Sequence, residues 1–255
     1  QNDKDFIMAV NWKKAEEYIK AGKGKIEKTK YAHNTWNDET HTGTSVIKDE
    51  VLVLDAMAMK DICYLMPCPK SPHGCDVDPT GEYIVGSGKL AALIPVFSFD
   101  KMTKAIAKKE YEGDYEGIPV LKYNSVLHGE VQKPGLGPLH TEFDGKGNAY
   151  TTFFVSSEVV KWDIKTLKVL DRVPTYYSVG HLMIPGGDSK KPFGKYLVAY
   201  NKITKDRYLP TGPELTQSAQ LYDISGDKMK LLLDFPTIGE PHYAQAAPAD
   251  LIRNN

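Results

Sequence analysis

The segment DGKGNAYTTFFVSSEVVKWDIKTLKVLD, residues 144–171, contains three short strand patterns that are separated by tight turns. The first follows a Gly-rich turn, the second ends in an aromatic residue and an aspartate, and the third follows directly. Asp163 and Thr166 suit the turn between the last two, because their side chains can bond nearby backbone groups. A parallel α/β sheet would need helices between successive strands, so this pattern indicates an all-β fold.

The same pattern recurs along the chain. A turn with Gly leads into an aromatic strand again in GEYIV (81–85) and FGKYLVA (193–199), and strands ending in aromatic-Asp recur in VFSFD (96–100) and QLYD (220–223). Repeats of four short strands at about 40–60 residues are typical of β-propeller blades. The chain is therefore predicted to be a partial β-propeller of about four to five blades.

Few helices are expected. The spacing predicts one over residues 12–21, capped by Asn11, and a second from a cap at Asp100 to about Lys109. Residues 33–45 are rich in polar side chains and are predicted to form a loop.

Composition excludes several classes of protein. The chain has 255 residues, 32 Lys and Arg, 33 Asp and Glu, and a formal charge of -1. Nucleic-acid-binding proteins and polybasic membrane-surface proteins show a strong basic excess, which is absent here. No run of about 18 apolar residues occurs, so no membrane-spanning helix is expected. The chain begins with Gln1 rather than Met, and we interpret it as a segment of a longer protein.

Three cysteines, Cys63, Cys68 and Cys75, are odd in number and close together. A disulfide framework is therefore not expected. With His73 they do not match the spacing of a common zinc site. We expect them to pack as small, inert apolar residues.

Four histidines share one local context. Each follows a Gly or Pro break, and they are separated by 67, 41 and 61 residues; they are His73, His140, His181 and His242. The first strand of each blade lines the channel of a propeller, so residues at its entrance are expected to converge on one axis. A ring of neutral imidazoles would suit copper, zinc, iron or nickel.

Two other interpretations remain open. The four histidines could be ordinary polar residues at loop–strand junctions of a non-catalytic β-propeller that serves as a binding scaffold. A propeller hydrolase or lactonase with one divalent ion would usually need carboxylates among its ligands, whereas imidazoles predominate here. His33, His41 and His128 lie outside the repeated context, and their roles are left open.

Several long strings resemble nitrous-oxide reductase. They are KSPHG (70–74), GLGPLHT (135–141), FDGKGNAYTT (143–152), VVKW (159–162), KDRYLP (205–210), DISGDKMKL (223–231) and EPH (240–242). The resemblance runs from about residue 5 to 252. It implies a seven-bladed propeller whose axis holds a four-copper, sulfide-bridged cluster bound by seven histidines, and a C-terminal cupredoxin domain that this segment does not contain.

The same resemblance implies the activity and its setting. The family reduces nitrous oxide to dinitrogen and water with two electrons and two protons. Its members are generally periplasmic homodimers that receive electrons through the cupredoxin domain or from a cytochrome. An isolated segment with four of the seven ligands is expected to be inactive.

Residue by residue, the resemblance assigns His73, His140, His181 and His242 as copper ligands. It aligns Lys202 with a lysine near the open edge of the cluster and Glu240 with a carboxylate beside the last ligand. We therefore expect catalytic roles for Lys202 and Glu240. Calcium binding is left open, because Ser71 and Gln217 stand where the family has calcium ligands, although Glu214 is close by.

Overall fold

The structure is a computed structural model that describes residues 5–37, 42–59, 61–202, 217–237 and 241–248, without the side chains of residues 29–49. The chain divides into two compact units. The larger contains the described parts of residues 1–7, 66–111 and 121–255, and the smaller contains residues 8–65 and 112–120. The two units are described separately below.

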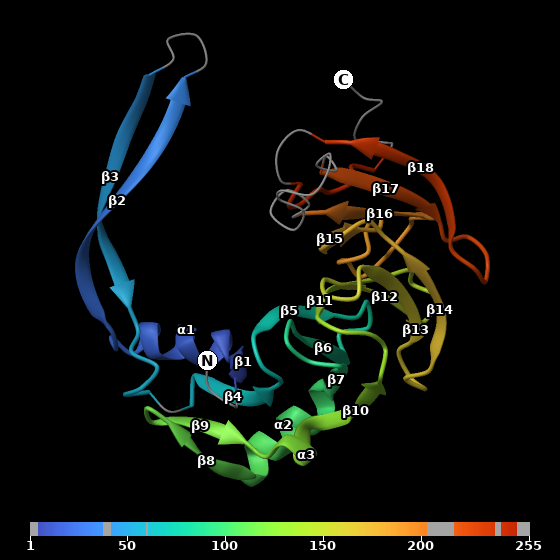
Figure 1. Cartoon of the computed structure of the whole chain (residues 1–255). Helices are drawn as coiled ribbons and strands as arrows, with labels where there is room; N and C mark the ends of the chain where they lie inside the picture. Colours follow the sequence, from blue (N-terminus) through green and yellow to red (C-terminus); the bar gives the residue numbers. More distant parts are fainter. Residues whose placement is uncertain (1–4, 38–41, 60, 203–216, 238–240, 249–255) are drawn as a thin grey trace. The chain divides into compact units, whose positions relative to one another are not determined.

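The larger unit contains three four-stranded sheets with the orders β5-β6-β7-β10, β11-β12-β13-β14 and β15-β16-β17-β18 (Figure 1). All pairs within these sheets are antiparallel. The strands are β5 (Pro72–Val77), β6 (Tyr83–Gly88), β7 (Leu93–Ser98), β10 (Leu127–Gln132), β11 (Pro138–Phe143), β12 (Asn148–Phe153), β13 (Glu158–Asp163), β14 (Val169–Pro174), β15 (Val179–Met183), β16 (Tyr196–Asn201), β17 (Ser218–Asp223) and β18 (Lys230–Pro236). Consecutive four-stranded meanders are propeller blades, so the predicted partial β-propeller is confirmed.

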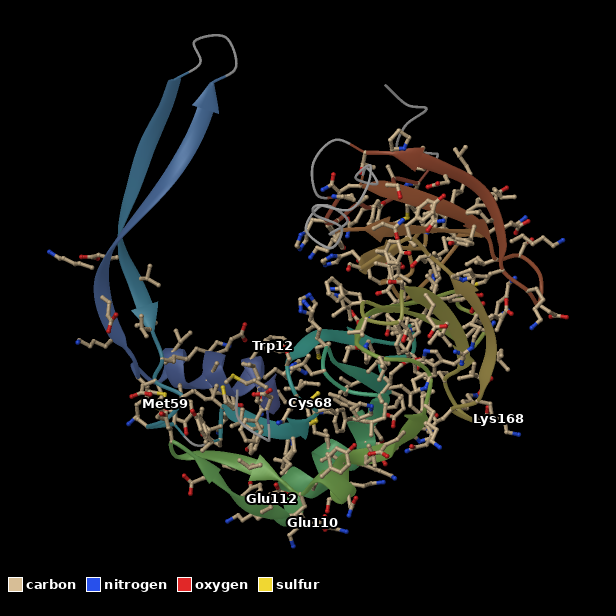
Figure 2. All side chains as sticks on the ribbon, in the orientation of Figure 1. Trp12, Met59, Cys68, Glu110, Glu112 and Lys168 are labelled. Carbon is tan, nitrogen blue, oxygen red and sulfur yellow. The ribbon has the colours of Figure 1, made fainter. Side chains whose placement is uncertain are left out.

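The middle sheet is apolar on both faces, because it packs between the other two. On one face, Phe153 and Trp162 belong to a cluster that also contains residues of β6 and β7. On the other, Tyr150 and Val159 pack with residues of β15 and β16. Side chains fill the space between neighbouring sheets (Figure 2). This two-sided burial explains why the strands read as nearly continuous apolar runs in the sequence.

Aspartates fix the turns between strands. The carboxylate of Asp78 accepts hydrogen bonds from the backbone N–H of Thr80 and Tyr83, and Asp144 accepts from that of Lys146. Asp163 accepts from the N–H groups of Lys165 at 3.1 Å and Thr166 at 2.7 Å, as the sequence predicted. These bonds let each strand reverse within a few residues.

An insertion between β7 and β10 contains two helices, α2 (Phe99–Lys108) and α3 (Tyr123–Val126). The predicted helix is present, but its cap is Ser98 rather than Asp100. The Ser98 hydroxyl accepts from the backbone N–H of Lys101 at 3.1 Å. Asp100 lies in the first turn and forms an ion pair with Lys104, where its negative charge also favours the helix dipole.

The smaller unit contains α1 (Trp12–Lys20) and a two-stranded ribbon of β2 (Lys25–Asn37) and β3 (Thr42–Val53). The side chain of Asn11 caps α1 by accepting from the N–H of Lys14, as predicted. The expected loop over 33–45 is wrong for residues 33–37 and 42–45, which pair within the ribbon; residues 38–41 lie outside the described residues.

Most of a fourth four-stranded sheet also belongs to the smaller unit. Its order is β1 (Asp5–Val10), β4 (Cys63–Cys68), β9 (Ile118–Leu121) and β8 (Tyr111–Tyr115), and β4 and β9 are parallel. This order differs from the meander of the other three sheets. None of the helices in the described ranges is long and apolar enough to span a membrane.

Candidate metal centre

Three of the four candidate histidines occupy the same kind of position. His73, His140 and His181 lie near the start of β5, β11 and β15, the first strand of each meander. In each case the register with the next strand shifts by one extra residue at the histidine, between Pro72 and Gly74, Pro138 and Thr141, and Val179 and Leu182. Such β-bulges re-aim a side chain out of the regular alternation of a strand.

The structure brings the four imidazole rings together. The ring centroids of His73 and His140 are 5.3 Å apart in an edge-to-face arrangement. His140 and His181 stack at 3.8 Å with an angle of 19° between their planes, and His181 and His242 are 4.6 Å apart. His242 lies in the segment 241–248, which follows β18 in the sequence. One histidine from each meander and one from the segment beyond thus form a continuous chain of rings.

The nitrogens of the two central rings are suited to bind a metal. Nε2 of His140 and Nδ1 of His181 are buried and have no hydrogen-bond partner among the described residues. Burial, together with neighbouring His181, lowers the pKa of His140 to about 3. Burial, together with His242 and Lys202, lowers that of His181 to about 4. Both rings are therefore neutral near pH 7, which is the form that coordinates metals.

The donor set is made of imidazole nitrogens. His140 and His181 stack with an angle of 19° between their planes. In the described ranges, no group of three or more His, Cys, Asp or Glu side chains is arranged around a single metal ion. The donor set fits copper, which accepts imidazole readily.

Lys202 lies beside these rings. It is only 7% exposed, and its Nζ is 3.3 Å from Nε2 of His242. The aliphatic part of its side chain passes over Gly180, where an added Cβ would be 2.3 Å from Lys202 Cδ. The positive charge of Lys202 also contributes to the lowered pKa of His73, after burial. A cation is thus fixed next to the cluster, and the glycine before His181 makes room for it.

Other candidate residues are placed differently. Glu240 and Glu214 lie outside the described residues, as does His41, and the side chain of His33 is not described. His128, on the outer strand β10, accepts or donates a hydrogen bond at 3.1 Å to the Lys165 carbonyl and contacts the ring of Tyr83. His128 therefore has a local structural role and is not part of the chain of rings.

The expectation that the cysteines pack as buried, inert residues holds for two of the three. All three are free, and Cys63 and Cys68 are buried, but Cys75 on β5 is exposed. Burial raises the pKa of Cys68 to about 12 and that of Cys75 to about 11, so these thiols stay protonated near neutral pH. Protonated thiols are poor nucleophiles and poor metal ligands.

Two acidic residues near the histidines were not predicted. Asp76 follows His73 on β5, and Glu142 follows His140 on β11. Asp76 accepts a hydrogen bond from the backbone N–H of Thr141 in the next sheet, and Glu142 accepts one from the N–H of Ile184, directly after β15. A sequence signal existed, since both are acidic residues inside short strands that carry a candidate ligand. Their partners, however, are backbone groups, which leave no pattern of residue types.

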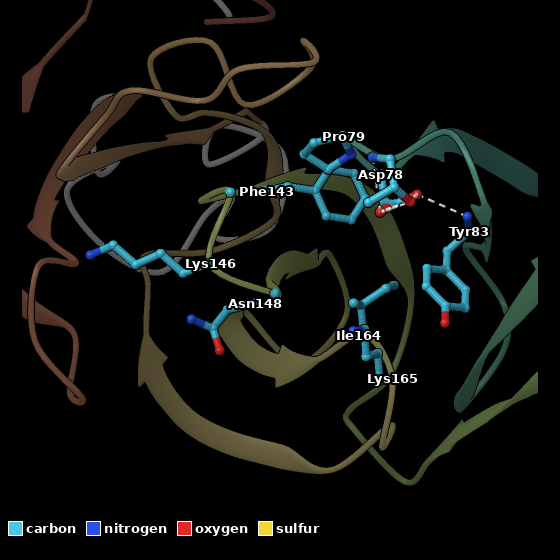
Figure 3. A pocket seen from close by; sticks show the side chains of 11 residues that line it. Asp78, Pro79, Tyr83, Phe143, Lys146, Asn148, Ile164 and Lys165 are labelled. Carbon is cyan, nitrogen blue, oxygen red and sulfur yellow. Dashed lines mark hydrogen bonds between the residues drawn. The ribbon is translucent and has the colours of Figure 1, made fainter.

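A pocket of about 250 Å³ is present elsewhere in the larger unit. Figure 3 shows Asp78, Tyr83, Phe143 and Ile164 among the side chains that line it. Asp78 and Phe143 lie at the ends of β5 and β11 opposite to His73 and His140. The pocket therefore does not belong to the histidine cluster.

The buried titratable groups predict how stability depends on pH in the metal-free chain. Burial raises the pKa of Asp76 to about 7 and that of Glu142 to about 8, whereas it lowers the pKa values of His140 and His181. Between about pH 4 and 6.5 the unfolded chain binds more protons than the folded chain at the histidines and fewer at the two acids. The two effects on the free energy of unfolding therefore oppose each other. Above about pH 6.5 the histidines of the unfolded chain lose their remaining protons, and the two acids dominate. The folded state then binds more protons, so stability is expected to fall as pH rises toward 8.

We therefore expect the free energy of unfolding to decrease by on the order of 1 kcal/mol between pH 6.5 and 8. Urea denaturation followed by circular dichroism at several pH values measures it. The double variant Asp76→Asn and Glu142→Gln should show a flatter profile over this range. An equally steep decrease in the variant would assign the effect to other groups.

Comparison with known proteins gives a consistent result. A family model described as the nitrous oxide reductase propeller repeat matches residues 172–242. The chain is 39% identical over 198 residues to the nitrous-oxide reductase of Stutzerimonas stutzeri, covering 74% of this chain and 29% of that protein. It is 33% identical over 263 residues to that of Pseudomonas fluorescens, covering 99% of this chain and 37% of the relative.

A third relative, the nitrous-oxide reductase of Ralstonia nicotianae, is 39% identical over 185 residues. The match covers 68% of this chain and 27% of that protein, so the chain spans about a third of the length of these relatives or less. The repeated blades and these similarities agree. The chain belongs to the nitrous-oxide reductase family.

Proposed function

We propose that this chain is a copper-binding propeller segment of an enzyme that reduces nitrous oxide to dinitrogen and water. The observation that carries the proposal is the set of four neighbouring rings, of which His140 and His181 present buried nitrogens without a described partner. A buried polar atom without a hydrogen bond costs free energy. Copper coordination would offset that cost, and it would explain why two neutral, half-buried rings stack with buried, unpartnered nitrogens.

His73, His140, His181 and His242 would hold the copper, which in the family's four-copper sulfide cluster delivers two electrons to nitrous oxide. The chain's own groups serve the accompanying proton and charge chemistry. As the N–O bond breaks, the oxygen gains negative charge, and the ammonium of Lys202 beside His242 can stabilise it or donate a proton. For Glu240 we propose a carboxylate that orients His242 or moves protons.

The setting of the reaction is inferred from the relatives. We propose a periplasmic location, a homodimer of the complete enzyme, and electron delivery by a cupredoxin domain or a cytochrome. The resemblance to the family also leaves open calcium binding near Ser71 and Gln217. The 255 residues alone offer four of the seven ligands that the resemblance implies, so we propose that they do not sustain turnover.

Copper loading tests the proposal directly. The chain is incubated with Cu(I) under anaerobic, reducing conditions, desalted, and analysed for metal, alongside a variant in which His73, His140, His181 and His242 are alanine. We expect bound copper in the chain and almost none in the variant. Equal copper in both would favour the non-catalytic scaffold.

Turnover forms a second arm of the same test. Reduced dye and isotopically labelled nitrous oxide are supplied, and dinitrogen is measured by mass spectrometry. The chain alone should give no sustained dinitrogen, whereas the complete polypeptide that carries it should. Turnover by the chain alone would show that four histidines suffice.

A further inference from the structure

Two carboxyl groups, on the half-buried Asp76 and the buried Glu142, link each histidine-bearing strand to the backbone of the next sheet's first strand or the residue directly after it. Oδ2 of Asp76 on β5 accepts a hydrogen bond of 2.8 Å from the backbone N–H of Thr141, the residue after His140. Oε2 of Glu142 on β11 accepts one of 2.7 Å from the backbone N–H of Ile184, three residues after His181. Each carboxyl group thus belongs to one blade and binds the backbone of the next.

The backbones come very close where these contacts form. A Cβ added to Gly74 would be 1.9 Å from the carbonyl oxygen of Leu139, so the residues next to His73 and His140 touch through their main chains. A Cβ added to Gly187 would be 2.2 Å from Oε2 of Glu142, so only glycine admits the carboxyl group. The separation of the strands is therefore fixed at the positions that set the distances between the rings.

Burial of these groups is costly. Glu142 is only 8% exposed, and neither carboxyl group forms a salt bridge with a described residue. Because β5, β11 and β15 are edge strands of their sheets, some of their N–H groups have no partner within the sheet. Asp76 accepts from one N–H group on β11, that of Thr141, and Glu142 accepts from the N–H of Ile184, directly after β15. An arrangement that is expensive to bury and that joins ligand-bearing strands suggests a role in placing the ligands.

We propose that Asp76 and Glu142 are positioning residues that fix the spacing of the rings of His73, His140 and His181. Their function is to accept a hydrogen bond, so an amide oxygen can replace the carboxyl oxygen. This inference rests on the proposed function in one respect only, the identity of the bound metal. The spacing of the rings is a property of the metal-free chain.

The first measurement therefore omits copper. In the chain labelled with ¹⁵N-histidine, the stacked rings of His140 and His181 shift each other's ring-proton resonances. We expect Asp76→Ala and Glu142→Ala to move these resonances toward the positions of unstacked rings. Asp76→Asn and Glu142→Gln should retain them. Glu158→Ala is the matched control, since it removes a partly buried carboxyl group from β13, where it pairs with Arg172.

The second measurement is the affinity for Cu(I), by competition with a chromophoric chelator. The alanine variants should bind about 10–100-fold more weakly, as is typical when a residue that orients metal ligands is removed. The amide variants should stay within a few-fold of the unchanged chain. If an alanine variant does not fold, Asp76→Leu and Glu142→Leu fill similar volume without an acceptor and replace it.

The outcomes are distinguishable. Unchanged ring resonances and affinity in the alanine variants would overturn the positioning role. An amide variant as damaging as alanine would also overturn it, because charge or proton transfer would then be required. Altered resonances in a chain that binds no copper would support the positioning role and reject the proposed function.

Discussion

Replacing His140 with alanine is expected to abolish tight copper binding. His140 is one of the two central members of the chain of rings: it contacts His73 on one side and stacks on His181 on the other. Its removal deletes one nitrogen ligand and the packing that orients the next. Loss of a residue that merely orients a ligand weakens metal binding by about 10–100-fold, so loss of the ligand itself should exceed about 100-fold.

The measurement is Cu(I) affinity by chelator competition, with metal content after desalting as a second readout. His128→Ala is the matched control, because it removes a histidine on the outer strand β10 of a neighbouring sheet, where it contacts Lys165 and Tyr83 and no ring of the cluster. It should leave copper binding unchanged. Wild-type affinity in the His140→Ala variant would remove this residue from the ligand set.

The same substitution should have little effect on the stability of the metal-free chain. Alanine leaves a cavity, which destabilises the fold. It also removes a buried nitrogen that has no partner among the described residues, which stabilises it. A large change in copper affinity with a small change in the free energy of unfolding is therefore the signature of a ligand rather than of a core residue.

The blades could be predicted because their signals are local. The turn at Asp163 depends on bonds to residues two and three positions away, and the apolar strands around Trp162 follow directly. The repeated Gly or Pro break before each histidine likewise predicts the start of a strand. Three of the four histidines lie near the start of β5, β11 or β15. Short-range chemistry of this kind can be read in one sequence.

Features that depend on distant partners could not be predicted. The bulge at His140 is defined by its register against β12, and the bond between Asp76 and Thr141 joins residues from two sheets. The ribbon of β2 and β3 contradicts the expected loop. The polar composition of these segments indicated a loop, but two polar, Thr-containing segments pair with each other as strands. Helix α2 is capped by Ser98, two residues before the predicted cap Asp100. A difference of two residues is usual for the position of helix ends.

Replacing Lys202 with methionine is expected to reduce turnover of the complete enzyme by about 10²–10³-fold, the usual effect of losing one preorganised group that stabilises developing charge. Methionine keeps the aliphatic contact with Gly180 and removes the ammonium beside His242. Copper content should stay the same, because Lys202 contributes no ligand. Lys168→Met is the control, since Lys168 is exposed in the turn before β14 and projects away from the sheets (Figure 2).

A measurement on the metal-free chain separates the charge of Lys202 from its packing. Because this charge helps to lower the pKa of His181, histidine titration by NMR should show that pKa rising in the Lys202→Met variant. Gly180→Ala should also raise the pKa of His181, although it keeps the lysine. The added Cβ would lie 2.3 Å from Lys202 Cδ and displace the lysine side chain. If turnover and the His181 titration are unchanged in both variants, the buried ammonium does not act on the cluster, and its position must be explained by packing alone.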